Sequence, residues 1–518
     1  MKQTVEGKHN VKNGVRLAVF SAIAILLQAN WLYQFFFRLG ERYTWLSALV
    51  EIVTVLVVLL IYGKHINSSM KLPWIMLILA FPFLGLFLYG MIGWNGSNRV
   101  MRKRYEKIDQ LLLPLLPQND EELKALRDKD PGVAGQCRYI RDFAKYPVYQ
   151  NTAVEFYPDA ADGLAAQLEE LKKAEKFIFM EYHAIEDSTA IEPLLALLKE
   201  KVAAGVEVRL FYDYVGSMGF VGNSFAKKMT ALGIQCRVFN PIQPVLNLFM
   251  NHRDHRKITV IDGKVGFVGG YNLADEYFHV TAPYGYWLDT GVKLIGPAVR
   301  SLTVTFLENW NAIRRKGGAD TDFEKYLPDA SAVPGAVGFV QPYADSPLDN
   351  ERVGENVYIN VLRNARDYAW FITPYLIITD EMEHAFAMAA KSGVDVRVIT
   401  PGIPDKKMVY SLTRSYYAGL ARNGVRIYEY TPGFCHAKQC VSDDKLCTCG
   451  TINLDFRSLY HHFENGVLLC DCAAVGEMKT QFEALFPQCR EVTGQYANGR
   501  SNFLRFRQLI LRLFAPLL

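Results

Sequence analysis

The sequence lacks several features that mark common functional classes. Its net charge is only +4 over 518 residues, so no strong overall field favours binding to nucleic acid. Its nine cysteines are scattered and odd in number, which argues against a disulfide scaffold and fits a reducing compartment or buried thiols. No Cys-x-x-Cys pair or Cys/His cluster has zinc-ligand spacing. We therefore predict an active site without metal or cofactor, and no nucleic-acid partner.

Charge is also scarce along three apolar stretches near the beginning of the chain, at 17–37, 45–62 and 72–92. The third has no charged residue and carries Trp74 and Tyr89 near its ends, as a membrane span with an aromatic belt does. Its length meets the ~20 residues that a span needs. The first has a basic lead-in but no small-x-small cleavage site, so we interpret it as an uncleaved anchor rather than a signal peptide.

The number of membrane crossings is open. Lys and Arg flank both ends of this region, and the positive-inside rule places both ends in the cytoplasm. Three spans cannot satisfy that rule. Either two stretches cross and one is re-entrant or interfacial, or the N-terminal tail lies outside.

Helices and strands alternate twice in the rest of the chain, which predicts an α/β fold with two tandem domains and mixed, largely parallel sheets. A Gly/Pro/Asp-rich stretch at 316–350 separates the two halves. The C-terminal segment has an Arg-rich polar face and either contacts the membrane or packs on the protein's own surface. The predicted units are a membrane-anchoring region at 1–97, a basic juxtamembrane segment and linker at 98–148, α/β domains at 149–325 and 326–490, and an amphipathic C-terminal helix at 491–518.

One pattern, His-x-Lys-x4-Asp, occurs once in each half and is followed at the same offsets by Gly and Asn. His and Lys lie two apart in a strand-like run, so both side chains point to one face. The predicted catalytic motif residues are His255, Lys257 and Asp262 in the first half and His436, Lys438 and Asp443 in the second, followed by Asn272 and Asn453.

Together the two copies predict a single composite site. Two ammonium groups and two amides suit a group with dispersed negative charge, such as a phosphate. Two imidazoles allow one to attack phosphorus while the other protonates the leaving oxygen. Asp262 and Asp443 fall at hairpin turns, so we expect them to brace the hairpins rather than to do chemistry.

Each catalytic histidine also needs an orienting carboxylate on its other ring nitrogen. Asp289 follows His255 in the first half, and Glu464 follows His436 in the second. Each precedes an apolar strand, so the two positions match within the repeat. The alternative is a surface acid at the start of a strand. The histidines outside the repeat are expected to be ordinary structural or surface residues: His183, His252, His279, His461 and His462.

These motifs resemble the phospholipase D superfamily and, more closely, bacterial cardiolipin synthases. The resemblance rests on 251–258 (NHRDHRKI), 269–277 (GGYNLADEY), 450–458 (GTINLDFRS) and the apolar segment 71–93. One departure is 461–466 (HHFENG), which has His where the family more often has Asn before Phe-Glu.

The resemblance implies two phospholipase D-like domains and ping-pong phosphatidyl transfer between two phosphatidylglycerol molecules. It implies His255 as nucleophile and His436 as acid and base, with the motif lysines and asparagines on the phosphate oxygens. It also implies a multi-pass protein of the bacterial cell membrane, with cytoplasmic catalytic domains and anionic lipids as partners. The oligomeric state is open.

Three alternatives remain at this stage. A phospholipase D, or a phosphatidyltransferase with another acceptor such as phosphatidylethanolamine, would carry the same motifs. A nuclease would too, but the apolar stretches and the absence of a basic stripe argue against it. An inactive membrane scaffold need not keep all six motif residues, which are present here.

Overall fold

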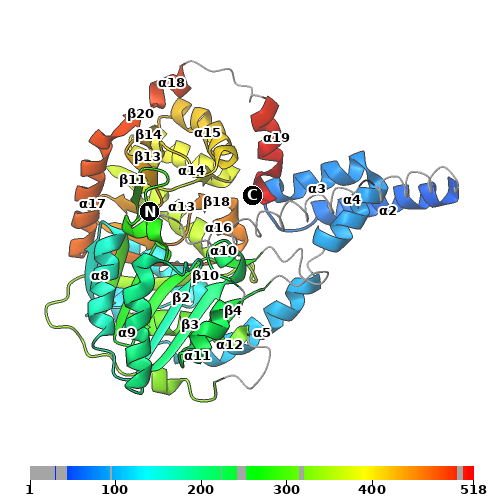
Figure 1. Ribbon diagram of the computed structural model, residues 1–518. Helices are drawn as coiled ribbons and strands as arrows, with labels where there is room; N and C mark the ends of the chain where they lie inside the picture. Colours follow the sequence, from blue (N-terminus) through cyan, green and yellow to red (C-terminus); the bar gives the residue numbers. More distant parts are fainter. Residues whose placement is uncertain are drawn as a thin grey trace.

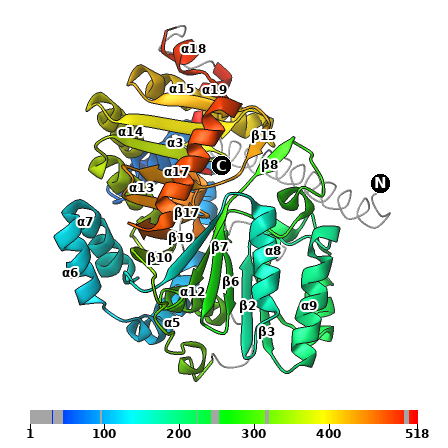
Figure 2. The ribbon, with the colours of Figure 1, turned by 90° about the vertical axis from the view of Figure 1, so that its left-hand side faces the viewer.

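The computed structural model describes residues 44–93, 96–222, 224–241, 252–313, 320–498 and 506–517, together with residue 30. Two α/β domains form the body of the molecule, and three N-terminal helices project from one side (Figure 1). Figure 2 shows the two domains stacked, with strands β8 (Tyr286–Leu288) and β15 (Gly433–Cys435) meeting at their boundary.

The two central sheets have the same strand order. In the first domain the order is β1 (Ala153–Tyr157), β9 (Gly291–Ile295), β7 (Val265–Gly269), β6 (Lys257–Ile261), β2 (Phe177–Tyr182), β3 (Glu207–Asp213) and β4 (Gln235–Phe239). In the second it is β10 (Phe339–Asp345), β19 (His462–Cys470), β17 (Leu446–Gly450), β16 (Gln439–Ser442), β11 (Tyr368–Ile372), β13 (Asp395–Pro401), β14 (Arg426–Tyr430) and β20 (Cys489–Glu491). The sequence repeat is therefore a repeat of whole domains.

The predicted α/β class with two domains is confirmed, but the expectation of largely parallel sheets is wrong. Along the strand orders given above, β2–β3–β4 and β11–β13–β14 run parallel and the other neighbours are antiparallel. The reason lies in the motifs themselves. Each forms a hairpin, β6–β7 or β16–β17, whose two strands must be antiparallel.

Helices cover the sheets and complete a core that runs through both domains. One hydrophobic cluster includes Val268, Val292 and Leu302 from the first domain and Val467 and Leu468 from the second. The main covering helices are α8 (Ala160–Leu171), α9 (Glu192–Ala203), α11 (Phe225–Ala231), α12 (Val299–Ala312), α13 (Val353–Asn364), α14 (Asp380–Lys391), α15 (Lys407–Arg422) and α17 (Ala473–Leu485). A shared core fixes the domains relative to one another, as a site built from both requires.

The motif aspartates brace the hairpins, as predicted. Asp262 accepts hydrogen bonds from the backbone N–H groups of residues 175–177 at 2.8, 2.8 and 2.7 Å. Asp443 does the same for residues 366–368 at 2.7, 2.9 and 2.8 Å. Both have positive φ, 52° and 54°, a turn conformation that Asp tolerates because its side chain bonds locally. Each carboxylate thereby ties the hairpin to the start of the neighbouring strand, β2 or β11.

Changing Asp443 to Ala is expected to lower the free energy of unfolding by about 3 kcal/mol, since three donors lose a charged acceptor. The variant should keep its turnover per folded molecule within a few-fold. Thermal denaturation and specific activity of the folded fraction measure the two effects. Asp187→Ala, which removes an exposed ion pair with Lys228, is the control and should change neither. A normal melting temperature with lost turnover would contradict the bracing role.

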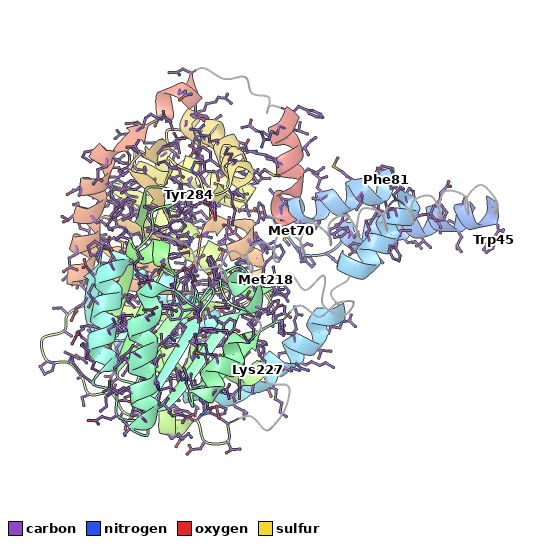
Figure 3. The ribbon with its side chains drawn as sticks, in the orientation of Figure 1. Trp45, Met70, Phe81, Met218, Lys227 and Tyr284 are labelled. Atoms are coloured by element: carbon purple, nitrogen blue, oxygen red, sulfur yellow. The ribbon has the colours of Figure 1, made fainter. Side chains whose placement is uncertain are left out.

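The apolar N-terminal region forms α2 (Thr44–Tyr62), α3 (Ser68–Ala80) and α4 (Pro82–Leu88). Figure 3 shows Trp45 at the far tip of this projection. Within the part of the chain that the structure describes, no helix is both long and apolar enough to cross a membrane. The stretch 72–92 is not one continuous helix: α3 ends at Ala80 and α4 begins at Pro82, which has no N–H with which to continue α3. The first apolar stretch, 17–37, lies outside the described residues apart from residue 30.

Two contacts attach this projection to the body. Asn67 caps α3 and donates to Glu381 of α14 at 2.9 Å. The C-terminal helix α19 (Phe506–Phe514) packs against both α3 and α15, and it lies beside α3 in Figure 1. Gly85 lets α4 pack on α3, since a Cβ there would lie 2.6 Å from the Ile78 Cα. Helices α2–α4, the C-terminal helix and the second domain are thus joined by direct contacts.

Candidate active site

The two motif histidines lie at the boundary between the domains, each just before the first strand of its hairpin. The His255 N–H donates to the Phe463 carbonyl at 2.9 Å, and the His436 N–H donates to the Leu288 carbonyl at 2.7 Å. Strand β5 (Arg253–Asp254) pairs in parallel with the beginning of β19, and β15 pairs in parallel with β8. Each histidine is thus held by a strand of the opposite domain.

This crossing decides which carboxylate orients which histidine. His255 Nδ1 lies 2.9 Å from both carboxylate oxygens of Glu464, and His436 Nδ1 lies 2.6 Å from Asp289 Oδ2. Both carboxylates are fully buried. Each predicted carboxylate thus lies against a motif histidine, and that histidine belongs to the other half of the chain. The physical reason is the strand pairing across the boundary. Strand β19, which contains Glu464, pairs with β5 just before His255. Strand β8, which ends just before Asp289, pairs with β15 just before His436.

The two lysines lie beneath the imidazoles and are almost completely buried. Lys257 Nζ donates to the His255 carbonyl at 2.7 Å. Lys438 Nζ lies 2.7 Å from His436 Nδ1 and also donates to the His436 carbonyl. Neither lysine forms an ion pair with a described residue, so the two buried ammonium groups form a positive site that an anion such as a phosphate can neutralise.

The two asparagines differ in how much of their amide is already used. Asn272 accepts from the Ala184 N–H at 3.1 Å and donates to the Tyr277 hydroxyl at 2.8 Å. One N–H of its amide remains for a ligand. Asn453 Oδ1 is buried and has no hydrogen-bond partner among the described residues. The side chain of Asn453 also makes a hydrogen bond with the Asp455 carboxylate.

Comparison with known proteins agrees with this geometry. The model of the family "Cardiolipin synthase, PLD-like domain" matches residues 168–284 and 358–486, and "Phospholipase_D-nuclease N-terminal" matches 48–94. A cardiolipin synthase of Alkalihalophilus pseudofirmus is 30% identical over 508 residues, covering 97% of this chain and 99% of that protein. The chain belongs to the cardiolipin synthase family of the phospholipase D superfamily.

Two further comparisons concern another relative and a solved structure with the same fold. An uncharacterised protein of Streptococcus mutans is 41% identical over 461 residues, which is 89% of this chain and 99% of that one. The crystal structure of phosphatidylserine synthase from Haemophilus influenzae has a TM-score of 0.55 at 15% identity, covering 74% of this chain and 97% of that chain, and so shows the same fold. The match to the cardiolipin synthase family model and the cardiolipin synthase relative make the protein a phospholipase D-type phosphatidyltransferase.

Two histidines that the sequence pattern did not single out also line this phosphatidyltransferase site. His183 meets the His255 ring edge-on with centroids 4.9 Å apart, and the ring of His462 lies 5.4 Å from that of His255. His183 is held by the Asp254 carbonyl at 2.6 Å, and Gly216 leaves room for its ring. These two histidines thus lie against the His255 ring rather than apart from the motif. The one signal for His462 was its place in HHFENG, two residues before Glu464 on the same strand.

Whereas His255 is surrounded by other histidines, His436 is surrounded by Tyr, Trp and Phe rings. Its ring lies 5.2 Å from Tyr277, 5.6 Å from Trp287 and 5.9 Å from Phe434, measured between centroids. The two halves of the phosphatidyltransferase site, similar in their motifs, thus differ in their linings. One side is rich in imidazole and the other in apolar rings.

Burial sets the protonation of the site. It lowers the pKa of His255 and of His436 well below the ordinary histidine value, and the neighbouring lysines lower both further. Burial also lowers the pKa of Lys257 to about 7 and that of Lys438 to about 8, and raises the pKa of Asp289 to about 6. At neutral pH both imidazoles are therefore uncharged, as a nucleophile or general base must be.

Transfer is accordingly expected to have a bell-shaped pH profile. The rate falls as pH drops below about 6, where Asp289 becomes protonated and stops orienting His436. It falls again as pH rises through about 7 to 8, where Lys257 and Lys438 lose the protons that attract phosphate. A bound phosphodiester raises both lysine pKa values, so the alkaline limb of kcat should lie at higher pH than that of kcat/KM. If the alkaline limbs of kcat and kcat/KM lay at the same pH, the lysines would not bind the substrate phosphate.

One group in the described part of the chain has the geometry of metal ligands. The ligating atoms of His255, His462 and Glu464 all lie within 4.8 Å of one another. Spacing along the sequence could not reveal this group, because its members come from both domains.

Proposed function

We propose that this phosphatidyltransferase is a cardiolipin synthase that uses phosphatidylglycerol as both donor and acceptor, so that two phosphatidylglycerol molecules give one cardiolipin and one glycerol. The observation that carries the proposal is the pair of buried histidine–carboxylate dyads, which flank two lysines at one site. The relatives named cardiolipin synthase, at about 30% identity over most of the chain, support the choice of substrate.

In the first step His255 Nε2 attacks phosphorus of the donor lipid and the phosphorus–oxygen bond to glycerol breaks. The bound anionic phosphodiester, together with Asp289, favours the protonated form of His436. The protonated ring gives its Nε2 proton to the departing alkoxide, which leaves as glycerol. In the second step His436 takes the proton from the terminal hydroxyl of a second phosphatidylglycerol. The freed oxygen attacks phosphorus, the phosphorus–nitrogen bond breaks, and cardiolipin forms.

The remaining side chains hold the phosphate and the imidazoles. Lys257, Lys438 and the amides of Asn272 and Asn453 bind the non-bridging oxygens, where charge builds up in the transition state. Glu464 fixes the ring of His255 and stabilises its positive form, and Asp289 does so for His436. Every group that this mechanism needs is supplied by the chain itself.

The test supplies purified protein with phosphatidylglycerol alone in the presence of a chelator. Cardiolipin and glycerol should appear in a one-to-one ratio. Phosphatidic acid as the main product would make the protein a phospholipase D, and untouched lipid would overturn the proposal. Adding phosphatidylethanolamine in competition identifies the preferred acceptor, and a parallel assay with plasmid DNA should show no cleavage.

We further propose that α2–α4 and α19 hold the catalytic domains at the cytoplasmic face of a bacterial cell membrane. Large apolar side chains are exposed together on these helices: Trp45, Ile52, Val55, Leu56, Leu59 and Leu60 on α2, Leu72, Met76 and Leu79 on α3, and Phe506, Leu509 and Ile510 on α19. The next helix, α5 (Gly96–Leu112), carries Arg99, Arg102, Lys103, Arg104 and Lys107. Such a basic stretch beside an apolar surface favours anionic lipid.

Changing Leu509 to Glu is expected to lower the rate on anionic vesicles by about tenfold, because a leucine that enters the lipid interface is replaced by a charge. The rate on phosphatidylglycerol dispersed in detergent should not change. Val337→Glu, at a position that is 72% exposed in the linker between the domains, is the matched control. If both rates fall together in the Leu509 variant, α19 serves only to pack on the protein itself.

A further inference from the structure

A strand of the second domain presents two possible metal ligands on one face. His462 and Glu464 are two residues apart on β19, so their side chains point the same way. The parallel pairing of His462 with Arg253, and of Phe463 with Asp254, brings His255 against them. The three side chains are 8%, 0% and 7% exposed for His462, Glu464 and His255.

His462 has hydrogen-bonding capacity that the described protein does not use. Neither ring nitrogen has a hydrogen-bond partner among the described residues. Its Nδ1 lies 3.5 Å from Glu464 Oε1, which is too long for a good hydrogen bond. Buried polar groups are almost always paired. An imidazole left unpaired beside a carboxylate and a second imidazole therefore points to a ligand.

The types of the three side chains indicate which metal ion would bind. Two imidazole nitrogens and one carboxylate oxygen are the ligands that zinc takes where a coordination position stays open. Magnesium and calcium prefer oxygen ligands and fit this set poorly. We propose that His255, His462 and Glu464 form an inhibitory site for Zn²⁺ or a similar transition-metal ion.

The proposed inhibition follows from the tautomer of His255, and it rests on the role assigned to that residue under the proposed function. A metal between Glu464 and His255 takes the lone pair of Nδ1, the nitrogen that faces the carboxylate. The neutral ring then carries its proton on Nε2, which has no lone pair left to attack phosphorus. Only coordination bonds form, so removal of the metal restores the enzyme. Lys257 and Lys438 repel the cation, so an anionic substrate should compete with it.

The test uses the full chain after dialysis against a chelator. Zn²⁺ should inhibit cardiolipin formation reversibly, and Co²⁺ should give the visible absorption bands of a site with nitrogen and oxygen ligands. His462→Asn should weaken inhibition and Co²⁺ binding at least about tenfold, the lower end of what the loss of even an outer partner costs. Each variant is compared with its own metal-free rate. His462→Gln is the second variant, and His384→Asn, at an exposed position on α14, is the matched control.

The outcomes separate the metal site from the proposed reaction. Co²⁺ binding that depends on His462 in a protein that makes no cardiolipin would support the site and overturn only the function. An active enzyme with no Co²⁺ spectrum and no Zn²⁺ inhibition would overturn the site alone. Inhibition that is equally strong in the His462 variants and in His384→Asn would place the metal elsewhere and also overturn the site.

Discussion

Changing His255 or His436 to Ala is expected to lower phosphatidyl transfer by at least about 10⁴-fold, because one ring forms the covalent intermediate and the other moves the proton in both steps. Groups that act as a unit are strongly non-additive. The double variant should therefore be no slower than either single one. Steady-state formation of cardiolipin from phosphatidylglycerol measures all three.

His279→Ala is the matched control for this experiment. His279 contacts Asp159 at 2.9 Å and lies outside the two dyads. Its loss should leave the rate within a few-fold of the unchanged enzyme. A His436→Ala variant that kept a substantial rate on phosphatidylglycerol would show that the site does not need its second imidazole and would contradict the two-histidine mechanism.

Glu464→Gln and Asp289→Asn are each expected to lower transfer by about 10²- to 10⁴-fold, since each keeps the shape of the acid but no longer stabilises a charged imidazole. Because the dyads cross between domains, each variant should resemble the loss of the histidine in the opposite half. Glu464→Gln should behave like a defect in His255, and Asp289→Asn like a defect in His436.

A lipid with a p-nitrophenyl leaving group separates these two defects, because p-nitrophenolate departs without needing a proton. In a single turnover, His436→Ala and Asp289→Asn should still release it at a substantial rate. His255→Ala and Glu464→Gln should not. If Asp289→Asn grouped with His255→Ala instead, the orienting acids would act within their own halves and the crossed arrangement would be contradicted.

The sequence was sufficient for the parts of the site that depend on local geometry. The spacing of His255 and Lys257 on a strand, and the position of Asp262 at a turn, follow from a period of two residues and from hairpin chemistry. In the structure Asp262 lies at the turn and accepts three backbone hydrogen bonds. His255, however, lies in the gap between β5 and β6 rather than on a strand with Lys257. The repeat likewise predicted two domains, because a motif found twice with the same flanking strands implies a duplicated unit.

What the sequence could not predict depends on contacts between segments far apart in the chain. Glu464 reaches His255 only because β19 pairs with β5 across the domain boundary, and no local pattern encodes that pairing. His462 enters the site by the same route. The break between α3 and α4 is different, because it follows from Pro82, a residue visible in the sequence that has no N–H for the helix ladder.

The most direct test of the central claim is to trap the covalent intermediate. Enzyme mixed with labelled phosphatidylglycerol in a single turnover is stopped in alkali, in which phosphohistidine survives, and digested for mass spectrometry. The proposed mechanism predicts a phosphatidyl group on the peptide that contains His255, and no such adduct in the His255→Ala variant. Cardiolipin formation without an adduct on either His255 or His436 would show direct transfer between the lipids and contradict the mechanism.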